Sequence, residues 1–226
     1  MLKVGVVLSG CGVMDGSEIH EAVLTLYFLD KQGAEVVFMA PDLSFKAVDH
    51  LSGRETGEMR NVLVESARIA RGKIRDIKEV KAAELDALIL PGGFGAAKNL
   101  CDFASKGAGA APHPEVARLV KEMHQFKKPI GAVCISPALI ASIFKGTSIT
   151  PLLTIGTDSS TAEALEKMNA RHEPHSVHEI SVDRENKIVS TPAYMLGQRI
   201  SEVGSGIEKL VSEVLSLARE KAGAVR

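Results

Sequence analysis

The sequence contains no tryptophan, two tyrosines and seven phenylalanines, so aromatic residues make up only 4% of its 226 residues. Stacking surfaces for single-stranded nucleic acids or sugars are hard to build from so few rings. An excess of basic residues is also missing, because 27 Lys and Arg face 28 Asp and Glu. Without such an excess, neither nucleic acid nor an anionic membrane surface has an electrostatic reason to bind. We expect neither as a partner.

Long apolar runs are absent as well. No run approaches the roughly 18 to 20 residues that a membrane-spanning helix needs. The N-terminal apolar stretch, which ends at Leu8, is too short for a secretory signal, and an Arg- and Ser-rich transit peptide is missing. The three cysteines are odd in number and widely spaced, which fits free thiols better than a disulfide framework. We therefore expect a cytoplasmic protein.

Short apolar runs alternate with helical patterns along the whole chain. The runs predict buried strands at 3–8, 34–40, 85–90 and 129–133, with further strands near 152–155, 178–182 and 187–190. Spacings of three and four predict helices from Ile19 to a cap at Gly33, and at 60–71, 113–125, 137–144, 159–168 and 198–219. Residues 42–59 are polar and favour a hairpin, and the Gly- and Ala-rich residues 104–112 favour a surface loop.

This alternation predicts an α/β fold, namely a flavodoxin-like three-layer sandwich with a mostly parallel sheet and helices on both faces. No Pro- or Ser-rich linker and no repeat divides the chain, so we expect one domain over residues 1–226. Ligands of such sheets bind at the carboxyl ends of the strands. The loops at 9–16, 91–97 and 134–137 should therefore meet at one edge and form the site.

Two glycine-bearing loops at this edge have more than one interpretation. The loop from Gly10 to Gly16 has the spacing G-x-G-x-x-x-G, one residue longer than the dinucleotide-binding fingerprint, which disfavours nucleotide binding. Gly92 and Gly93 follow a strand, but the Lys-Ser/Thr pair of a phosphate-binding loop does not follow them. Their amides could turn toward a reacting oxygen, or the pair could form a tight turn with positive φ.

Cys134 is the strongest candidate for a nucleophile. It directly follows an apolar strand and precedes Pro137, which favours the first turn of a helix, so the thiol is expected on a sharp strand-to-helix turn. Helix-end amides stabilise a thiolate, which predicts a lowered thiol pKa. The alternative is a small apolar cysteine buried in the core. Cys11 lies in a site loop as a redox partner or a packing residue, whereas Cys101 is expected only to pack.

A cysteine nucleophile needs a base, and the residue after Cys134 is Ile135 rather than histidine. Carboxylates are the alternative. Asp15 and Glu18 have the spacing of a capping box, with Asp at the N-cap and Glu at N3, which gives Glu18 a structural role. Glu21 lies one turn deeper beside the apolar stripe, where burial would raise its pKa toward the range of proton transfer. The alternative interpretation of Glu21 is an ordinary helix glutamate that is solvated or ion-paired.

The histidines do not form an obvious site. His172, His175 and His178 form an H-x-x-H-x-x-H series, but Pro174 interrupts any helix there, and the zinc motif H-E-x-x-H is not matched. The residue types suit a metal and the spacing does not, so we expect no metal site. The remaining histidines are expected at the surface or its boundary: His20, His50, His113 and His124.

Five blocks of the chain carry a resemblance to a known family: 9–21 (SGCGVMDGSEIHE), 91–99 (PGGFGAAKN), 133–137 (VCISP), 154–158 (TIGTD) and 191–195 (TPAYM). They resemble the DJ/PfpI superfamily of class I glutamine amidotransferase-like folds, and within it the ElbB branch, whose members are described as isoprenoid-biosynthesis-associated glyoxalases. The superfamily's nucleophile corresponds by position to Cys134 and its acidic neighbour to Glu21. The resemblance also implies an oxyanion site formed by backbone amides near Gly93 and Ile135.

This resemblance implies a cofactor-free glyoxalase that converts a small aldehyde substrate, such as glyoxal or methylglyoxal, to the 2-hydroxy acid through a cysteine hemithioacetal. It implies no nicotinamide, glutathione or metal, and a homodimer. Protease-like members carry a histidine directly after the cysteine, and Ile135 at that position argues against peptidase or amidase activity. Two alternatives remain: an amide hydrolase or amidotransferase with a histidine supplied by the fold, and a redox-responsive protein whose Cys134 sulfinate is stabilised by protonated Glu21.

Overall fold

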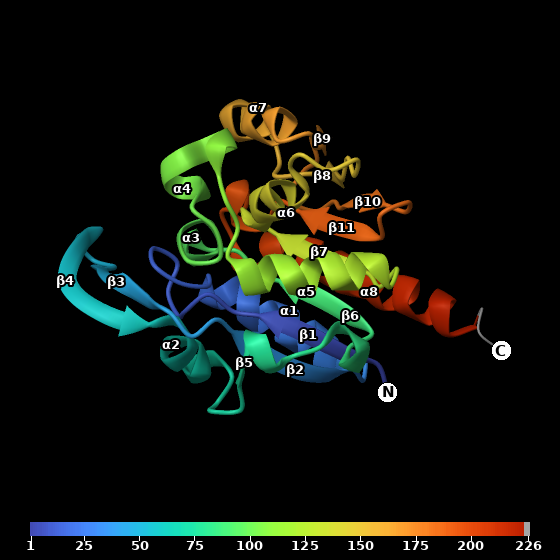
Figure 1. The fold of residues 1–226 in the computed structure, drawn as a ribbon, viewed down its shortest axis with the longest axis horizontal. Helices are drawn as coiled ribbons and strands as arrows, with labels where there is room; N and C mark the ends of the chain where they lie inside the picture. The colour runs from blue at the N-terminus through green and yellow to red at the C-terminus, as the bar shows by residue number, and fades with distance from the viewer. Residues whose placement is uncertain (224–226) are drawn as a thin grey trace.

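A seven-stranded sheet runs through the middle of the molecule in the computed structural model, which describes residues 1–223 (Figure 1). Its strand order is β10-β11-β7-β6-β1-β2-β5, and all neighbouring strands are parallel except β10, which is antiparallel to β11. The strands are β1 (Lys3–Val7), β2 (Glu35–Ala40), β5 (Arg75–Asp76), β6 (Ala87–Leu90), β7 (Ile130–Val133), β10 (Ser181–Asp183) and β11 (Ile188–Thr191). The central strands β6 and β7 are buried throughout, as their continuous apolar sequences predict.

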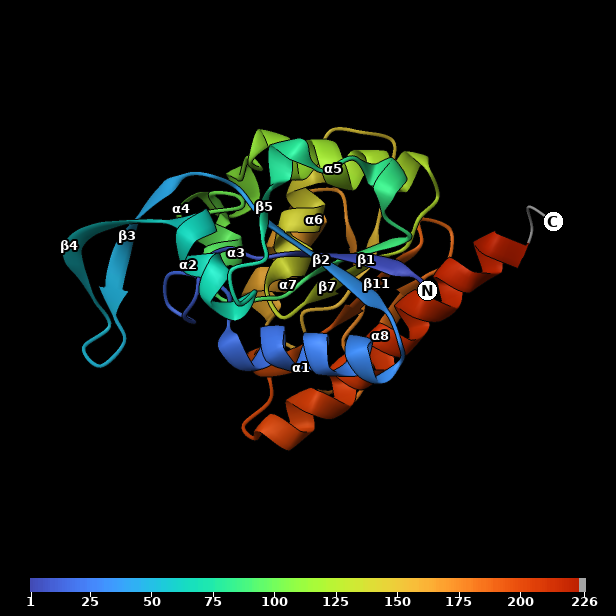
Figure 2. The same cartoon turned by 90° about the horizontal axis from the view of Figure 1, so that it is seen from below.

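Helices cover both faces of this sheet (Figure 2). On one face α1 (Ile19–Lys31) packs against the long α8 (Ile200–Gly223), and on the other lie α5 (Pro114–Gln125) and α6 (Ser136–Phe144). α2 (Val62–Ile69) contacts β2 and α1, and α7 (Ser159–Lys167) packs on α6. The expected α/β sandwich of flavodoxin type is confirmed. Within residues 1–223, no helix has both the length and the apolar composition to cross a bilayer.

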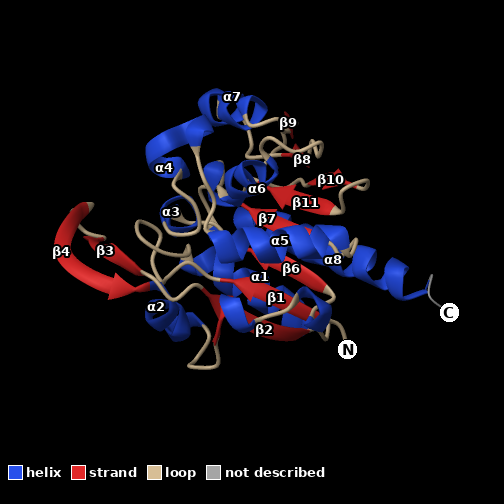
Figure 3. Ribbon diagram, viewed as in Figure 1, coloured by secondary structure: helices blue, strands red, loops and turns tan. Residues whose placement is uncertain are grey.

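A hairpin projects from the sandwich (Figure 3), formed by β3 (Ser44–Asp49) and β4 (Arg54–Asn61). It confirms the hairpin expected in residues 42–59. The prediction of a surface loop at 104–112 is wrong in part, because the first part of this segment forms α4 (Phe103–Lys106) and a 3-10 turn (Gly107–Gly109). Two short strands were not expected: β5, and β9 (Arg171–His172), which pairs with β8 (Leu152–Leu153). A strand of two residues is too short to show a periodic pattern in the sequence.

The carboxyl ends of β1, β6 and β7 bring three loops into contact, as expected. The Glu18 N–H donates to the Gly92 carbonyl at 3.0 Å, and the Gly95 N–H donates to the Gly16 carbonyl at 2.9 Å. The Ser136 hydroxyl donates to the Pro91 carbonyl at 2.8 Å. The loops at 9–16, 91–97 and 134–137 therefore form one hydrogen-bonded surface at this edge of the sheet.

Candidate active site

Cys134 occupies the sharp turn between β7 and α6. Its φ is +62°, a left-handed conformation that costs a residue with a side chain on the order of 1 kcal/mol or more and persists only where surrounding structure imposes it. The Cys134 N–H is held by the Thr191 carbonyl at 2.9 Å, and Pro137 lies in the first turn of α6. The predicted strand-to-helix elbow is therefore present.

Glu21 lies in the first turn of α1 and is fully buried. Its Oε2 accepts the Gly92 N–H at 3.1 Å, and its Oε1 accepts the Tyr194 N–H at 3.2 Å. Its carboxyl group is also hydrogen-bonded to the Cys134 thiol. The solvated alternative for Glu21 is excluded, and the two predicted groups form a buried dyad.

The dyad has strongly perturbed acidities. Burial, and after it the nearby Glu18 carboxylate, raise the pKa of Glu21 to about 8 despite the lowering effect of the hydrogen bonds from Tyr194, Cys134 and Gly92. Burial and the Glu21 charge also raise the pKa of the Cys134 thiol. The expectation of a lowered thiol pKa is therefore wrong, because the helix-end amides are outweighed by burial beside a carboxylate.

Two backbone amides point at the sulfur. The N–H groups of Gly93 and Ile135 donate to Sγ of Cys134 and act to lower its pKa. Ile135 is the N-cap of α6, where the first N–H groups have no partner within the helix. Gly93 has φ of +95°, so the tight turn and the amide donor, which were alternatives in the sequence, occur together. Gly92 differs from the expectation, because its N–H donates to Glu21 rather than toward the sulfur.

The glycines of both loops allow the loops to pack closely. A Cβ on Gly16 would lie 2.4 Å from the Cys11 nitrogen, and one on Gly93 would lie 2.3 Å from the Glu18 nitrogen. The space between the loops is therefore filled by their own backbones. This packing accounts for the glycine pattern of residues 10–16 without a bound dinucleotide.

Replacement of Gly92 by alanine is expected to disrupt the dyad. A Cβ at this position would lie 2.4 Å from Cβ of Cys134 and 2.5 Å from Oε2 of Glu21. Such overpacking costs about 1–3 kcal/mol, so we expect Gly92→Ala to lower the melting temperature by several degrees. Gly109→Ala is the matched control, because its Cβ would meet nothing closer than 3.8 Å. Equal behaviour of the two variants would contradict this account of Gly92.

The capping of α1 differs from the prediction. Glu18, not Asp15, is the N-cap, and its side chain accepts the Glu21 N–H at 2.7 Å. Asp15 instead accepts the Val48 N–H from the hairpin at 2.7 Å. The capping box fails because the helix begins at Ile19, three residues later than the Asp15 cap requires. Glu18 is thereby held beside Glu21.

Tyr194 belongs to the site and was missed in the sequence, whereas His20, expected at the surface, is exposed and contacts Tyr194. Tyr194 follows Ala193, whose φ of +45° turns the chain after β11 so that the Tyr194 N–H reaches Glu21. The Tyr194 hydroxyl is 2.7 Å from Nδ1 of His20. Ligands of such sheets bind at the carboxyl ends of the strands, and residues 192–195 follow the carboxyl end of β11. Applying this rule to β11 would have predicted that these residues belong to the site.

A cavity of about 500 Å³ opens beside the dyad. Cys134, Ile135, Gly93, Glu18 and Tyr194 line its inner part. Asp158 and Thr161 also line it, and the remaining part, which we call the apolar wall, consists of six side chains from neighbouring loops and helices: Val13, Phe94, Ala97, Phe103, Ala104 and Met195. This volume lies within the range of small-molecule binding sites.

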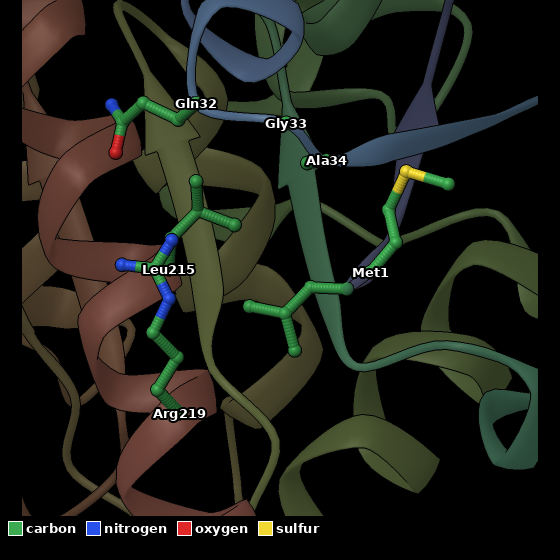
Figure 4. Close-up of a pocket in the computed structure, with 7 residues that line it drawn as sticks. Met1, Gln32, Gly33, Ala34, Leu215 and Arg219 are labelled. Atoms are coloured by element: carbon green, nitrogen blue, oxygen red, sulfur yellow. The ribbon is translucent and has the colours of Figure 1, made fainter.

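A second hollow, of about 270 Å³, lies at the opposite edge of the sheet (Figure 4). It is bordered by Met1 and Ala34 before the first two strands and by Leu215 and Arg219 of α8. It contains neither a cysteine nor a carboxylate among its lining residues. The cavity at Cys134 is therefore the candidate active site.

The other candidates from the sequence lie apart from the dyad. Cys11 is half-buried, does not line the cavity and has a thiol pKa raised by burial. The buried Cys101 donates to the Ala96 carbonyl at 3.3 Å, as a packing residue does. The three spaced histidines have separate partners: His172 accepts from the Ile155 N–H, His175 lies near Glu173 and Glu179, and His178 bonds Ser205. Across residues 1–223 no group of three or more potential metal ligands is present.

Together, these features define a class of protein: an α/β sandwich that presents a buried cysteine on a strained elbow, with a carboxyl group and two amides around its sulfur. The family comparison agrees. The model of the DJ-1/PfpI family matches residues 11–191, and the chain belongs to this family.

Similar proteins span almost the whole chain. The human glutamine amidotransferase-like class 1 domain-containing protein 3, mitochondrial, is 46% identical over 95% of this chain and 83% of its own length. The rat ES1 protein homolog, mitochondrial, is also 46% identical, over 95% of this chain and 84% of its own length. A crystal structure of an isoprenoid biosynthesis protein with an amidotransferase-like domain from Ehrlichia chaffeensis has a TM-score of 0.90 at 39% identity, over 96% of this chain and 99% of that chain.

These relatives correct one expectation. Both the human and the rat protein are named as mitochondrial, which contradicts the cytoplasmic location expected from the sequence. Cysteine number and spacing do not separate one reducing compartment from another.

Proposed function

We propose that this protein is a cofactor-independent glyoxalase that converts 2-oxoaldehydes to 2-hydroxy acids. The observation that carries the proposal is the buried Cys134–Glu21 pair, with a nucleophile, a proton-transfer group whose pKa is about 8, and two amide donors within one site. The net reaction adds one water to R–CO–CHO and gives R–CH(OH)–COOH. Its aldehyde carbon is oxidised and its ketone carbon reduced, so no external oxidant or reductant is needed.

The first step is addition of the sulfur to the aldehyde. Glu21 takes the thiol proton as the C–S bond forms, and the carbonyl oxygen becomes an alkoxide. The N–H groups of Gly93 and Ile135, which point at the sulfur in the free protein, are placed to donate to this oxygen. Glu21 then returns its proton to the alkoxide, and a hemithioacetal results.

The second step moves a proton between neighbouring carbons. The Glu21 carboxylate removes the proton on the former aldehyde carbon, which gives an enediolate, and then delivers that proton to the adjacent carbon, while the hydroxyl proton of the first carbon moves to the neighbouring oxygen. A thioester of Cys134 results. Water hydrolyses it, the hydroxy acid leaves, and the thiol is regenerated.

The pKa of Glu21 sets an expected pH dependence. Below about pH 8 both members of the dyad are protonated and no base is present, so kcat/KM for glyoxal is expected to rise with pH through a midpoint near 8.

Glu18→Gln removes a neighbouring charge that raises the pKa of Glu21, while its amide oxygen can still cap α1. We expect the midpoint to fall, and a fall of about half a unit raises the rate at pH 6.5 about threefold. The exposed Glu35→Gln is the control, and a midpoint unchanged by Glu18→Gln would contradict the assigned coupling.

The product assay tests the proposal. Glyoxal and methylglyoxal are supplied to the purified protein with a chelator and without glutathione, and glycolate and lactate are the expected products. Glutamine and simple amides, offered in parallel, are expected to stay intact. Amide hydrolysis without aldehyde turnover would replace the glyoxalase proposal by the amidase alternative.

The cavity bears on that alternative. A cysteine amidase of the family's protease-like type needs an imidazole at the thiol. Among the described residues that line the cavity, none is histidine, and His124 is bonded to Asn186. His20 is the histidine bonded to a cavity residue, and it contacts Tyr194 rather than Cys134.

A redox-responsive role is the second candidate, and the protonated Glu21 favours it. A carboxylic acid beside Cys134 can donate a hydrogen bond to a sulfinate oxygen, which stabilises that oxidation state. This candidate predicts a gain of two oxygens at Cys134 under mild peroxide and negligible aldehyde turnover. Mass spectrometry of the peroxide-treated protein separates the two proposals.

The narrower relationships are also proposals. Membership of the ElbB branch is supported by the match to the Ehrlichia isoprenoid biosynthesis protein with an amidotransferase-like domain. The single domain and the homodimer stay predictions.

A further inference from the structure

The composition of the cavity wall contrasts with that of the chain. The whole sequence has only seven phenylalanines and two tyrosines, yet Phe94, Phe103 and Tyr194 all line this cavity. Phe94 is 53% exposed, so about half of this residue is left uncovered by the protein itself. Glyoxal has no apolar substituent to place against these rings. A wall of this kind gains binding energy only from a ligand that carries apolar surface.

The charges at the cavity have one sign. Glu18 and Asp158 line it, and none of its lining residues in the described chain is Lys or Arg. Lys98 on α3 (Phe94–Lys98) is engaged elsewhere, because its ammonium donates to the Met14 carbonyl at 3.1 Å and lies 5.3 Å from the centre of the Phe94 ring. An anionic substituent in this cavity would meet two carboxylates and no lining cation.

From this wall and these charges we propose that the site selects uncharged 2-oxoaldehydes with an apolar substituent of about the size of a phenyl ring, over glyoxal and over anionic 2-oxoaldehydes. This substrate class rests on the proposed glyoxalase function. The reactive carbonyl carbons lie at Cys134, and the substituent lies against the apolar wall. The chemistry balances as before, since phenylglyoxal plus water gives mandelate.

The first test compares substrates and fills the cavity. Wild-type protein and Ala104→Trp are assayed with glyoxal and with phenylglyoxal. Ala104 is an exposed position on α4 that lines the cavity, so a larger side chain there occupies the substituent's space without entering the core. Ser105→Trp is the matched control, because Ser105 is exposed on the same helix and does not line the cavity.

We expect wild-type kcat/KM to be about tenfold or more higher for phenylglyoxal than for glyoxal, since burial of a ring of this size has at least that effect. Ala104→Trp is expected to bring the ratio of kcat/KM for phenylglyoxal to that for glyoxal close to one, and Ser105→Trp to keep the wild-type ratio. Comparing the phenylglyoxal-to-glyoxal ratio of kcat/KM between variants cancels the intrinsic reactivity of each aldehyde. Glyoxal turnover with no preference, or a preference untouched by Ala104→Trp, overturns the substrate class and leaves the proposed function. No turnover of either aldehyde overturns both.

The second test concerns charge. Phenylglyoxals with a para carboxamide or a para carboxylate differ mainly in charge, and we expect wild-type kcat/KM to be at least tenfold higher for the carboxamide. Asp158→Asn is expected to narrow this ratio severalfold, since Asn still caps α7, as Asp158 does through the Thr161 N–H. Glu163→Gln, on an exposed part of α7 outside the cavity lining, is the control. Equal rates with the two para substituents in the wild type would overturn the exclusion of anions.

Discussion

Cys134→Ser is expected to abolish conversion of glyoxal, with kcat/KM falling by on the order of a thousandfold or more. The hydroxyl group is far less acidic than a thiol, and neither Glu21 nor the amides of Gly93 and Ile135 can make it an effective nucleophile in a buried site. The fold should be kept, because serine matches the size of cysteine at this turn. Circular dichroism and glycolate formation are the two measurements.

The matched controls are the other two cysteines. Cys11→Ser and Cys101→Ser are expected to keep aldehyde turnover within a few-fold of the wild type, because neither thiol lines the cavity. Loss of turnover in Cys11→Ser, with retention in Cys134→Ser, would move the nucleophile to the loop after β1 and contradict the assignment.

Glu21→Gln is expected to lower kcat about 100- to 10,000-fold, the usual contribution of a positioned acid–base group. The substitution keeps the volume of the side chain and removes its ability to move a proton. Because Glu21 accepts the thiol proton in the first step and moves the carbon-bound proton in the second, both steps are expected to slow, and rapid mixing with glyoxal is expected to show slowed loss of free thiol at Cys134 and no glycolate. Full turnover by this variant would show that another group moves the proton.

The same variant has an expected signature in stability. Folding raises the pKa of Glu21 from an ordinary value of 4.5 to about 8, so the folded state binds this proton more tightly than the unfolded state. The free energy of unfolding should therefore decrease as pH rises from about 4.5 and level off above about 8. Between pH 6 and 8 the decrease is on the order of 2 kcal/mol, and Glu21→Gln should lack this part of the pH dependence. Urea unfolding at a series of pH values measures it.

The architecture of the site could be predicted from local patterns. Continuous apolar runs that end in Gly, Pro-Gly-Gly or Cys identify strands whose loops share one edge of a parallel sheet. The elbow at Cys134 follows from a strand and a proline three residues later, and the position of Glu21 follows from helix periodicity. These features depend on neighbours within a few residues, which is why the sequence shows them.

The electrostatics and the partners of the dyad could not be predicted in the same way. Glu21 is held by amides that lie 71 and 173 residues away along the chain, at Gly92 and Tyr194. Burial and the neighbouring Glu21 carboxylate reverse the expected direction of the Cys134 pKa. The start of α1 at Ile19 likewise depends on the hairpin, whose Val48 N–H takes Asp15 away from a capping role. Contacts between residues far apart in the sequence therefore determine these features, and local sequence patterns do not show such contacts.

The most direct test of the account is a side-by-side NMR assay of glyoxal conversion by the wild type, Cys134→Ser and Glu21→Gln, with a chelator and without glutathione. The account predicts glycolate from the wild type and, above the buffer rate, from neither variant. Glycolate formation by either variant at the wild-type rate, or no glycolate from the wild type, would contradict a glyoxalase built on this dyad.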